Sequence, residues 1–238
     1  MVPGNARPLL AIDTSTETAG VALLDGMWVS ELVWDAGRNQ TATLLPQVRH
    51  LLAVNDVAPR ALTAVVVAIG PGTFNGLRVG LSVAKGLSYG LGVPIIGVGT
   101  LDVVAYPFSR DHAPIRAFVP AGRGRVVFAD YRHRNGRWVR STDLRNARFD
   151  ELTTALTERT LLVGECPGEV AERLAAHTLV DLPSPALRLR RPAYLAELGY
   201  RRLQASSTDR LETLEPIYVH ATTASPADEA GTAARTRE

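Results

Sequence analysis

Short apolar runs separated by turn residues fill the first hundred positions, and their spacing predicts strands and helices in a definite order. Three runs with tight connections are typical of an antiparallel meander, and a fourth, rich in β-branched residues, is typical of a strand covered on both faces. The expected elements are strands at 9–13, 20–24, 28–34, 62–69 and 93–98 and helices at 41–54 and 77–91. This order predicts a mixed sheet flanked by helices.

The second half of the chain repeats this pattern in part, which predicts a duplicated α/β unit. The expected elements are helices at 101–109, 150–159 and 168–176, strands at 115–120, 125–132, 137–141 and 160–164, and a helix from Pro192 to about Leu203. We expect a first lobe of residues 1–100 plus about 190–220 and a second lobe of 101–190. Residues 221–238, rich in Ala, Thr, Pro and charge, are expected to form a disordered tail.

Composition excludes several classes of protein. Of 238 residues, 46% are hydrophobic and 21% are charged, which is enough apolar material for a core. Because Cys166 is the single cysteine, neither an intramolecular disulfide nor a cysteine-rich zinc site is expected, and a reducing compartment is favoured. No signal-peptide pattern or apolar run long enough for a membrane span is visible, so we expect a cytoplasmic protein without membrane association.

Positive charge is concentrated in one stretch, although the whole chain carries only +2. Residues 123–148 contain eight arginines and only two acidic residues, Asp130 and Asp143. The arginines are Arg123, Arg125, Arg132, Arg134, Arg137, Arg140, Arg145 and Arg148. Our preferred interpretation is a solvated strand hairpin whose arginines alternate outward. The alternative is a nucleic-acid surface.

Two turns could carry chemistry. Asp13, Thr14 and Ser15 lie between the first two strands, where a carboxylate followed by hydroxyls can hold a metal and a nucleotide phosphate. The simpler interpretation is a turn closed by side-chain-to-backbone bonds. The second turn, Gly70–Gly76, matches neither common nucleotide loop. It could attract an anion at the following helix N-terminus or serve packing alone, and both interpretations remain open.

The helix predicted at 77–91 has a ridge of small residues, Gly76, Gly80, Ala84 and Ser88, beside an apolar ridge, Val79, Val83, Leu87 and Leu91. Glycine costs a helix interior about 1 kcal/mol relative to alanine, so close packing must offset it. The ridge could pack on the chain's own sheet or against a helix of another chain. We favour the interface with another chain.

No catalytic constellation is recognisable in the sequence. The five histidines form no H-x-x-H or H-x-x-x-H pair, no G-x-S-x-G elbow exists, and nothing near Cys166 indicates an activated thiol. We therefore expect no catalytic residue, no metal and no cofactor.

Taken together, several segments resemble the TsaB family, also called YeaZ. The matching segments are Leu10–Thr16, Leu44–Pro46, Gly70–Gly80, Pro94–Leu101 and Glu215–Val219. The resemblance implies an α/β fold of the actin/Hsp70/sugar-kinase-like (ribonuclease-H-like) class, with two related lobes that each contain a mixed sheet flanked by helices. It also implies a non-catalytic subunit that dimerises with the TsaD transferase, which forms N6-threonylcarbamoyladenosine at position 37 of tRNAs reading ANN codons.

Further partners follow from the same resemblance. The ATPase TsaE is expected to join the larger complex, a homodimer is expected when the chain is alone, and tRNA is expected only through the complex. The family pairs through its first two helices, which implies a partner interface. Its residues here are Leu44, Leu45, Val48, Leu51, Leu77, Gly80, Val83, Ala84, Leu87 and Leu91.

This chain departs from the family pattern at two points. Gln40-Thr41 stands where a His-Ser or His-Thr pair is usual, and Pro120–Arg123 stands where Asp-Ala-Arg is usual. The helix interface depends on neither. The competing hypothesis is an ATP-binding small-molecule kinase or ATPase of the same fold that uses Asp13 for metal. A metallopeptidase is excluded by the lack of ligands, and a weak arginine contribution to tRNA docking on the complex remains open.

Overall fold

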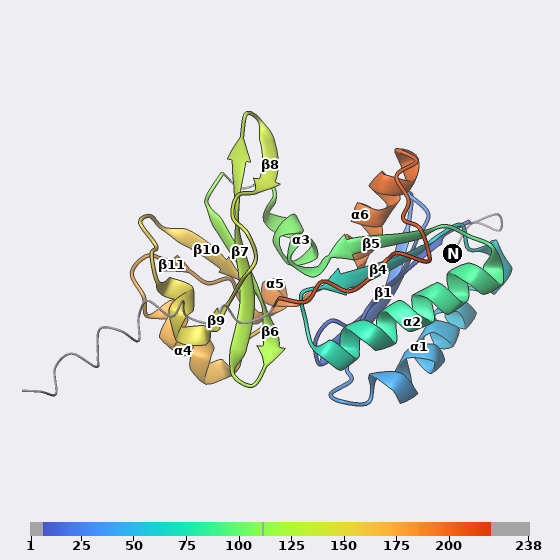
Figure 1. Ribbon diagram of the computed structural model, residues 1–238, viewed down its shortest axis with the longest axis horizontal. Helices are drawn as coiled ribbons and strands as arrows, with labels where there is room; N and C mark the ends of the chain where they lie inside the picture. Colours follow the sequence, from blue (N-terminus) through green and yellow to red (C-terminus); the bar gives the residue numbers. More distant parts are fainter. Residues whose placement is uncertain (1–6, 111, 220–238) are drawn as a thin grey trace, which may run out of the picture.

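The computed structural model describes residues 7–110 and 112–219, in which two β-sheets lie side by side with a short helix between them (Figure 1). The tail predicted at 221–238 lies outside the described residues. None of the helices within those ranges combines the length and apolarity of a membrane span.

The first sheet has the strand order β3-β2-β1-β4-β5. β1 (Leu9–Asp13), β2 (Thr18–Leu24) and β3 (Val29–Asp35) form the predicted antiparallel meander, and β4 (Val65–Gly70) and β5 (Ile95–Gly99) continue it in parallel. The mixed sheet predicted from the hydrophobic pattern is confirmed.

Helices cover both faces of this sheet because its central strands are apolar on both sides. Leu10 and Ile12 of β1 point into a core shared with α1 (Gln40–Val54) and α2 (Phe74–Leu91). Leu9 and Ala11, which alternate with them, point into a second core shared with α6 (Pro192–Gln204). α1 and α2 therefore lie side by side on one face, and among the described residues no other helix or strand covers their outer surfaces (Figure 1).

The second sheet repeats the topology of the first. Its order is β11-β10-β6-β7-β8, with an antiparallel meander of β6 (Ile115–Gly122), β7 (Arg125–Arg134) and β8 (Arg137–Arg140). β10 (Thr160–Val163) and β11 (Val180–Asp181) follow in parallel. The prediction of two related halves in an α/β fold is confirmed. The lobe boundaries at about 100 and 190 remain a prediction, which the return of α6 to the first sheet supports.

Short elements connect these strands. α3 (Thr100–Ala105) packs on β6 and runs into the 3-10 turn η2 (Tyr106–Phe108), while η1 (Pro59–Ala61) precedes β4. β9 (Arg145–Arg148), which pairs with β7, was not predicted, and neither were β11 and α5 (Pro185–Arg188). α4 (Gly168–Ala175) matches the predicted helix at 168–176.

The helix predicted at 150–159 is wrong. The structure has only the 3-10 turn η3 (Phe149–Thr153), after which Thr154 is extended and Ala155 has a φ of 60°. The buried guanidinium of Arg116 donates to the carbonyl oxygens of Leu152 and Thr154 at 2.8 and 3.1 Å. In a continuing helix those two carbonyls would accept hydrogen bonds from backbone amides further along the chain. Here the buried side chain of Arg116, on β6, takes the place of those amides.

Candidate functional site

The loop after β1 is buried between the two halves. Asp13, Thr14 and Ser15 are at most 2% exposed, and the polar groups of their side chains have partners within the chain. The Ser15 amide donates to Asp13 Oδ1 at 2.9 Å, Thr14 Oγ1 donates to the Gly76 carbonyl at 2.7 Å, and the Ser15 hydroxyl meets that of Thr100 at 2.9 Å. The loop is therefore closed by side-chain bonds, as in the simpler of the two sequence interpretations.

A buried arginine occupies the space in front of Asp13. Arg190 Nε lies 2.6 Å from Asp13 Oδ2, and its Nη1 lies 2.6 Å from Glu165 Oε1, just after β10. Its Nη2 donates to Thr16 Oγ1 at 3.1 Å and to the Thr18 carbonyl at 2.8 Å. One side chain thus connects the first sheet to the second.

The electrostatics of this cluster favour the charged arginine. Burial alone lowers the pKa of Arg190, but the carboxylates of Asp13 and Glu165 outweigh burial and raise the pKa above its usual value. Asp13 is consequently committed to an ion pair with Arg190, and its remaining oxygen accepts a backbone bond. These contacts give Asp13, Thr14 and Ser15 a structural role, and their role as nucleotide contacts stays a prediction.

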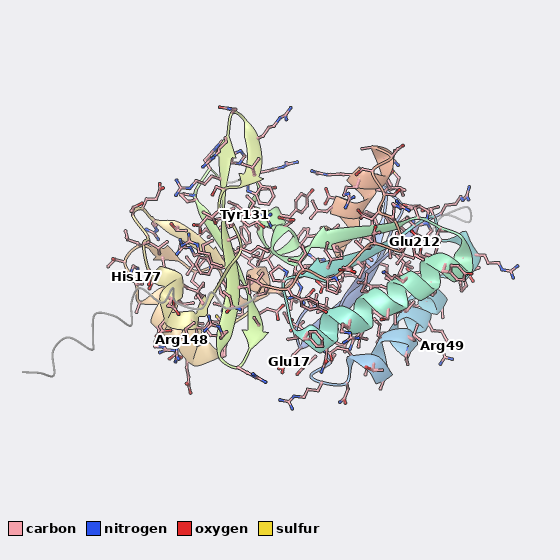
Figure 2. The ribbon with its side chains drawn as sticks, viewed as in Figure 1. Glu17, Arg49, Tyr131, Arg148, His177 and Glu212 are labelled. Atoms are coloured by element: carbon pink, nitrogen blue, oxygen red, sulfur yellow. The ribbon has the colours of Figure 1, made fainter. Side chains whose placement is uncertain are left out.

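A cleft of about 590 Å³ lies next to this loop, between the N-termini of α1 and α2 and the β6–β7 turn. Glu17, Arg38, Gln40, Phe74 and Arg123 contribute to its lining, and Figure 2 shows Glu17 at the lower edge of the molecule, where the two halves meet. None of the three predicted nucleotide contacts lines it. Gln40, in place of the family histidine, is buried and donates to the Thr16 carbonyl at 3.2 Å, so it holds the β1–β2 loop against α1.

The glycines of the Gly70–Gly76 turn, together with Gly80 of α2, serve packing inside the chain. Gly70 has a φ of 110°, and a Cβ there would lie 2.7 Å from the Ile217 carbonyl oxygen. A Cβ on Gly76 or Gly80 would overlap the Thr14 carbonyl or hydroxyl. At Gly76 and Gly80 the small-residue ridge therefore lets α2 approach the β1–β2 loop of its own chain, while the assignment of the ridge to a partner stays a prediction.

The predicted interface residues separate into two groups. Six are buried in the chain's own core: Leu44, Val48, Leu51, Leu77, Gly80 and Ala84. Four lie at or near the surface of α1 and α2: Leu45, Val83, Leu87 and Leu91. Leu45 is 52% exposed, while the other three are partly buried against the first core.

Sequence reasoning missed the open side of α2. Val79, Val83, Gly86 and Gly90 recur at intervals of four, three and four residues, which places them on one stripe. A Cβ added at Gly86 or Gly90 meets nothing within 4 Å, whereas one at Gly80 would clash. The spacing was present in the sequence, but only the packing distinguishes a filled glycine ridge from an open one.

The single cysteine has no activated thiol. Burial raises the pKa of Cys166, and Arg188, whose Nη1 lies 2.9 Å from the sulfur, only partly opposes that increase. In the ranges that the structure describes, no group of three or more His, Cys, Asp and Glu side chains is arranged to hold a metal ion.

Comparisons with known proteins agree on one family. A family model described as "TsaD: tRNA N6-adenosine threonylcarbamoyltransferase" matches residues 34–214. The Bacillus subtilis "tRNA threonylcarbamoyladenosine biosynthesis protein TsaB" is 36% identical over 129 residues, 54% of this chain and 56% of that protein. The Escherichia coli protein of the same name is 36% identical over 133 residues, 55% of this chain and 58% of that protein. The matches thus span little more than half the length of these relatives.

A solved structure extends the likeness to the whole fold. "YeaZ from Pseudomonas aeruginosa" superposes with a TM-score of 0.74 at 26% identity, covering 89% of this chain and 99% of that one. The predicted actin/Hsp70/sugar-kinase-like α/β class is therefore confirmed. From the match over residues 34–214 and these relatives, the chain belongs to the family of TsaD, tRNA N6-adenosine threonylcarbamoyltransferase, and within that family to the TsaB (YeaZ) proteins.

Proposed function

We propose that this chain is a non-catalytic subunit that dimerises with a TsaD transferase in the formation of N6-threonylcarbamoyladenosine at position 37 of tRNAs reading ANN codons. The names of its relatives, tRNA threonylcarbamoyladenosine biosynthesis proteins, support the pathway. The subunit takes no cofactor of its own. TsaE joins the larger complex, and the chain pairs with itself when TsaD is absent.

The observation that carries the partner role is the open face of α1 and α2. These helices cover one face of the first sheet, and no other element of the described chain packs on their outer surfaces (Figure 1). Exposed glycine in the interior of an 18-residue helix is unfavourable, and at Gly86 no residue of the described ranges uses the space that the missing side chain leaves. A helix of another protein could approach closely along this line.

Apolar side chains lie on α2 together with the open glycines and on the neighbouring helix α1. Val79 and Val83 share their stripe, and Leu45 on the neighbouring helix α1 is 52% exposed. Burial of such side chains against a partner contributes about 25 cal/mol for each Å² of apolar surface. Close approach at Gly86 with apolar contact along the two helices is the arrangement expected of a helix-on-helix interface.

The ion pair of Asp13 supports the non-catalytic part of the proposal. An enzyme of this fold that used Asp13 for metal would need that carboxylate free, and Arg190 holds it at 2.6 Å. The ATP-binding kinase or ATPase is therefore the weaker hypothesis. Isothermal titration of the full chain with ATP and Mg²⁺ distinguishes the two, because micromolar binding with turnover would favour the enzyme.

Co-purification with a TsaD protein tests the partner role. Gly86→Phe should fold, since an added Cβ would have no described atom within 4 Å apart from its own helical neighbours, and it should abolish the complex by blocking close approach. Gly168→Phe is the matched control: this glycine is exposed at the start of α4, a Cβ there also meets nothing within 4 Å, and complex formation should be unchanged. Unchanged complex formation by Gly86→Phe would refute the interface.

A further inference from the structure

The hairpin of β7 and β8 extends beyond the rest of the second half as a narrow arm (Figure 1). We define the arm as residues 131–140, in which Tyr131 pairs with Arg140 and Arg134 pairs with Arg137 across the two strands. Its tip, Asn135-Gly136, has positive φ angles of 52° and 72°, as a tight two-residue hairpin turn requires. The arm is therefore a regular hairpin with its side chains in fixed register.

The base of the arm is anchored to the neighbouring helix. Tyr131 is buried and donates its hydroxyl to Asp102 Oδ1 at 2.7 Å, and Trp138 stacks on it with ring centroids 4.9 Å apart. Near the tip, the His133 ring nitrogen Nε2 lies 2.9 Å from the Ser109 carbonyl oxygen. Figure 2 shows Tyr131 beside the short helix between the two halves. These contacts hold the arm in one orientation.

The arm carries unbalanced positive charge. It contains four arginines and no acidic residue. Arg132 pairs with Glu158 at 2.9 Å, whereas Arg134, Arg137 and Arg140 are exposed and form no ion pair with any residue in the described ranges. Arg134 and Arg137 stand directly opposite each other, and like charges in a cross-strand pair destabilise a hairpin. A fixed arm with this unfavourable pair is explained if an anionic partner neutralises it.

We propose that the arm contacts the phosphate backbone of RNA through Arg134 and Arg137, which share one face of the hairpin, and through Arg140, which lies on the opposite face nearer the base. Guanidinium groups bind phosphate oxygens in two-pronged geometry, and a repeating polyanion can engage several at once. The identification of the RNA as tRNA rests on the proposed function, while the charge argument does not. The proposal goes beyond the expectation that tRNA reaches the chain only through the complex, because it assigns a direct contact.

The arm lies apart from the proposed helix interface. α1 and α2 belong to the first sheet and the arm to the second; in Figure 1 the arm stands at the top of the molecule, and α1 and α2 lie at its lower right. No residue of the arm is among those that line the open face of α2. A protein on α1 and α2 would therefore leave the arm accessible to RNA.

The experiment measures binding of a fluorescent unmodified tRNA transcript to the full chain by anisotropy, between about 50 and 200 mM salt. The triple variant R134Q/R137Q/R140Q should lose at least about tenfold in affinity at the lower salt, and the slope of log K against log salt should shrink by about two, since three contacts contribute about 0.7 each. The matched control R49Q/R60Q/R173Q removes the same charge from exposed arginines outside the arm and should keep both values. Figure 2 shows Arg49 on α1, far from the arm.

Other results would overturn the proposal. No detectable tRNA binding by the parent chain would refute the direct contact. Equal losses of affinity in the two triple variants would mean that only the total charge of the chain matters. Vesicles of anionic phospholipid that bind the parent chain but not the arm variant, with tRNA affinity unchanged, would assign the arm to a membrane instead. Because these measurements need no partner subunit, their failure leaves the co-purification test untouched, and failure of co-purification leaves the arm to be judged on its own data.

Discussion

Replacement of Arg190 by methionine is the sharpest test of how the two halves are joined. The substitution removes a buried cation that makes four hydrogen bonds, to Asp13, Glu165, Thr16 and the Thr18 carbonyl. Asp13 has a side chain only 3% exposed and would be left as a buried charge without its partner. Breaking a buried pair in this way costs about 3–5 kcal/mol, which is a large part of the 5–15 kcal/mol by which folded proteins are typically stable.

Urea denaturation followed by tryptophan fluorescence measures that loss. The free energies are comparable only if the slope of the transition is the same in parent and variant. Arg201→Met is the control, because its pair with Glu197 is exposed and one helical turn apart, and such pairs are worth about 0.3–0.5 kcal/mol. Adding Asp13→Asn to Arg190→Met should recover part of the loss, since asparagine still accepts the Ser15 amide but carries no charge.

Two outcomes would refute this reasoning. One is a loss below about 1 kcal/mol for Arg190→Met, which would mean that Asp13 is readily solvated or neutralised. The other is additivity: the double variant would be less stable than Arg190→Met by the same free energy that Asp13→Asn costs in the parent chain. Independent sites add in this way, whereas two coupled charges do not.

The remaining predictions concern single side chains. Gly86→Ala should raise the free energy of unfolding by about 0.5–1 kcal/mol in urea titrations, and a decrease would contradict an open helical site. Burial and a hydrogen bond with Glu197 raise the pKa of Tyr106 from 10.0 to about 12. The protonated phenol therefore contributes to the free energy of unfolding below pH 10, and this contribution is lost as the pH rises through 12. The melting-temperature difference between the parent and Tyr106→Phe should change only in that window. Iodoacetamide should alkylate Cys166 more slowly than free cysteine at neutral pH until urea is added, because burial raises the thiol pKa; equal rates in the folded chain would refute this.

Local periodicity was sufficient to predict most of the fold. The meander of the first sheet, the buried strands and both long helices follow from alternation and helical spacing in single stretches of the chain. The helix predicted at 150–159 failed because its carbonyls bond to Arg116, a residue on a distant strand. No local pattern contains that information.

The candidate sites depended more heavily on long-range contacts. Arg190 is 177 residues from Asp13 in sequence, so its ion pair could not be derived from the segment that contains the aspartate. The helix at 77–91 was correctly placed, yet its glycines look alike in sequence. Only the packing shows that Gly80 lies against Thr14 whereas Gly86 faces open space.

The two halves share a strand order but differ in the connection between the antiparallel meander and the first parallel strand, β4 in the first half and β10 in the second. In the first half this connection contains the 15-residue helix α1, whereas in the second it contains β9 and the turn η3. The chain therefore has one paired-helix face of this kind within its described residues. A TsaD subunit and a second copy of the chain, as proposed partners, would have to compete for it. Heterodimer formation would then require any homodimer to dissociate first, and the concentration of free subunit would set the rate of assembly.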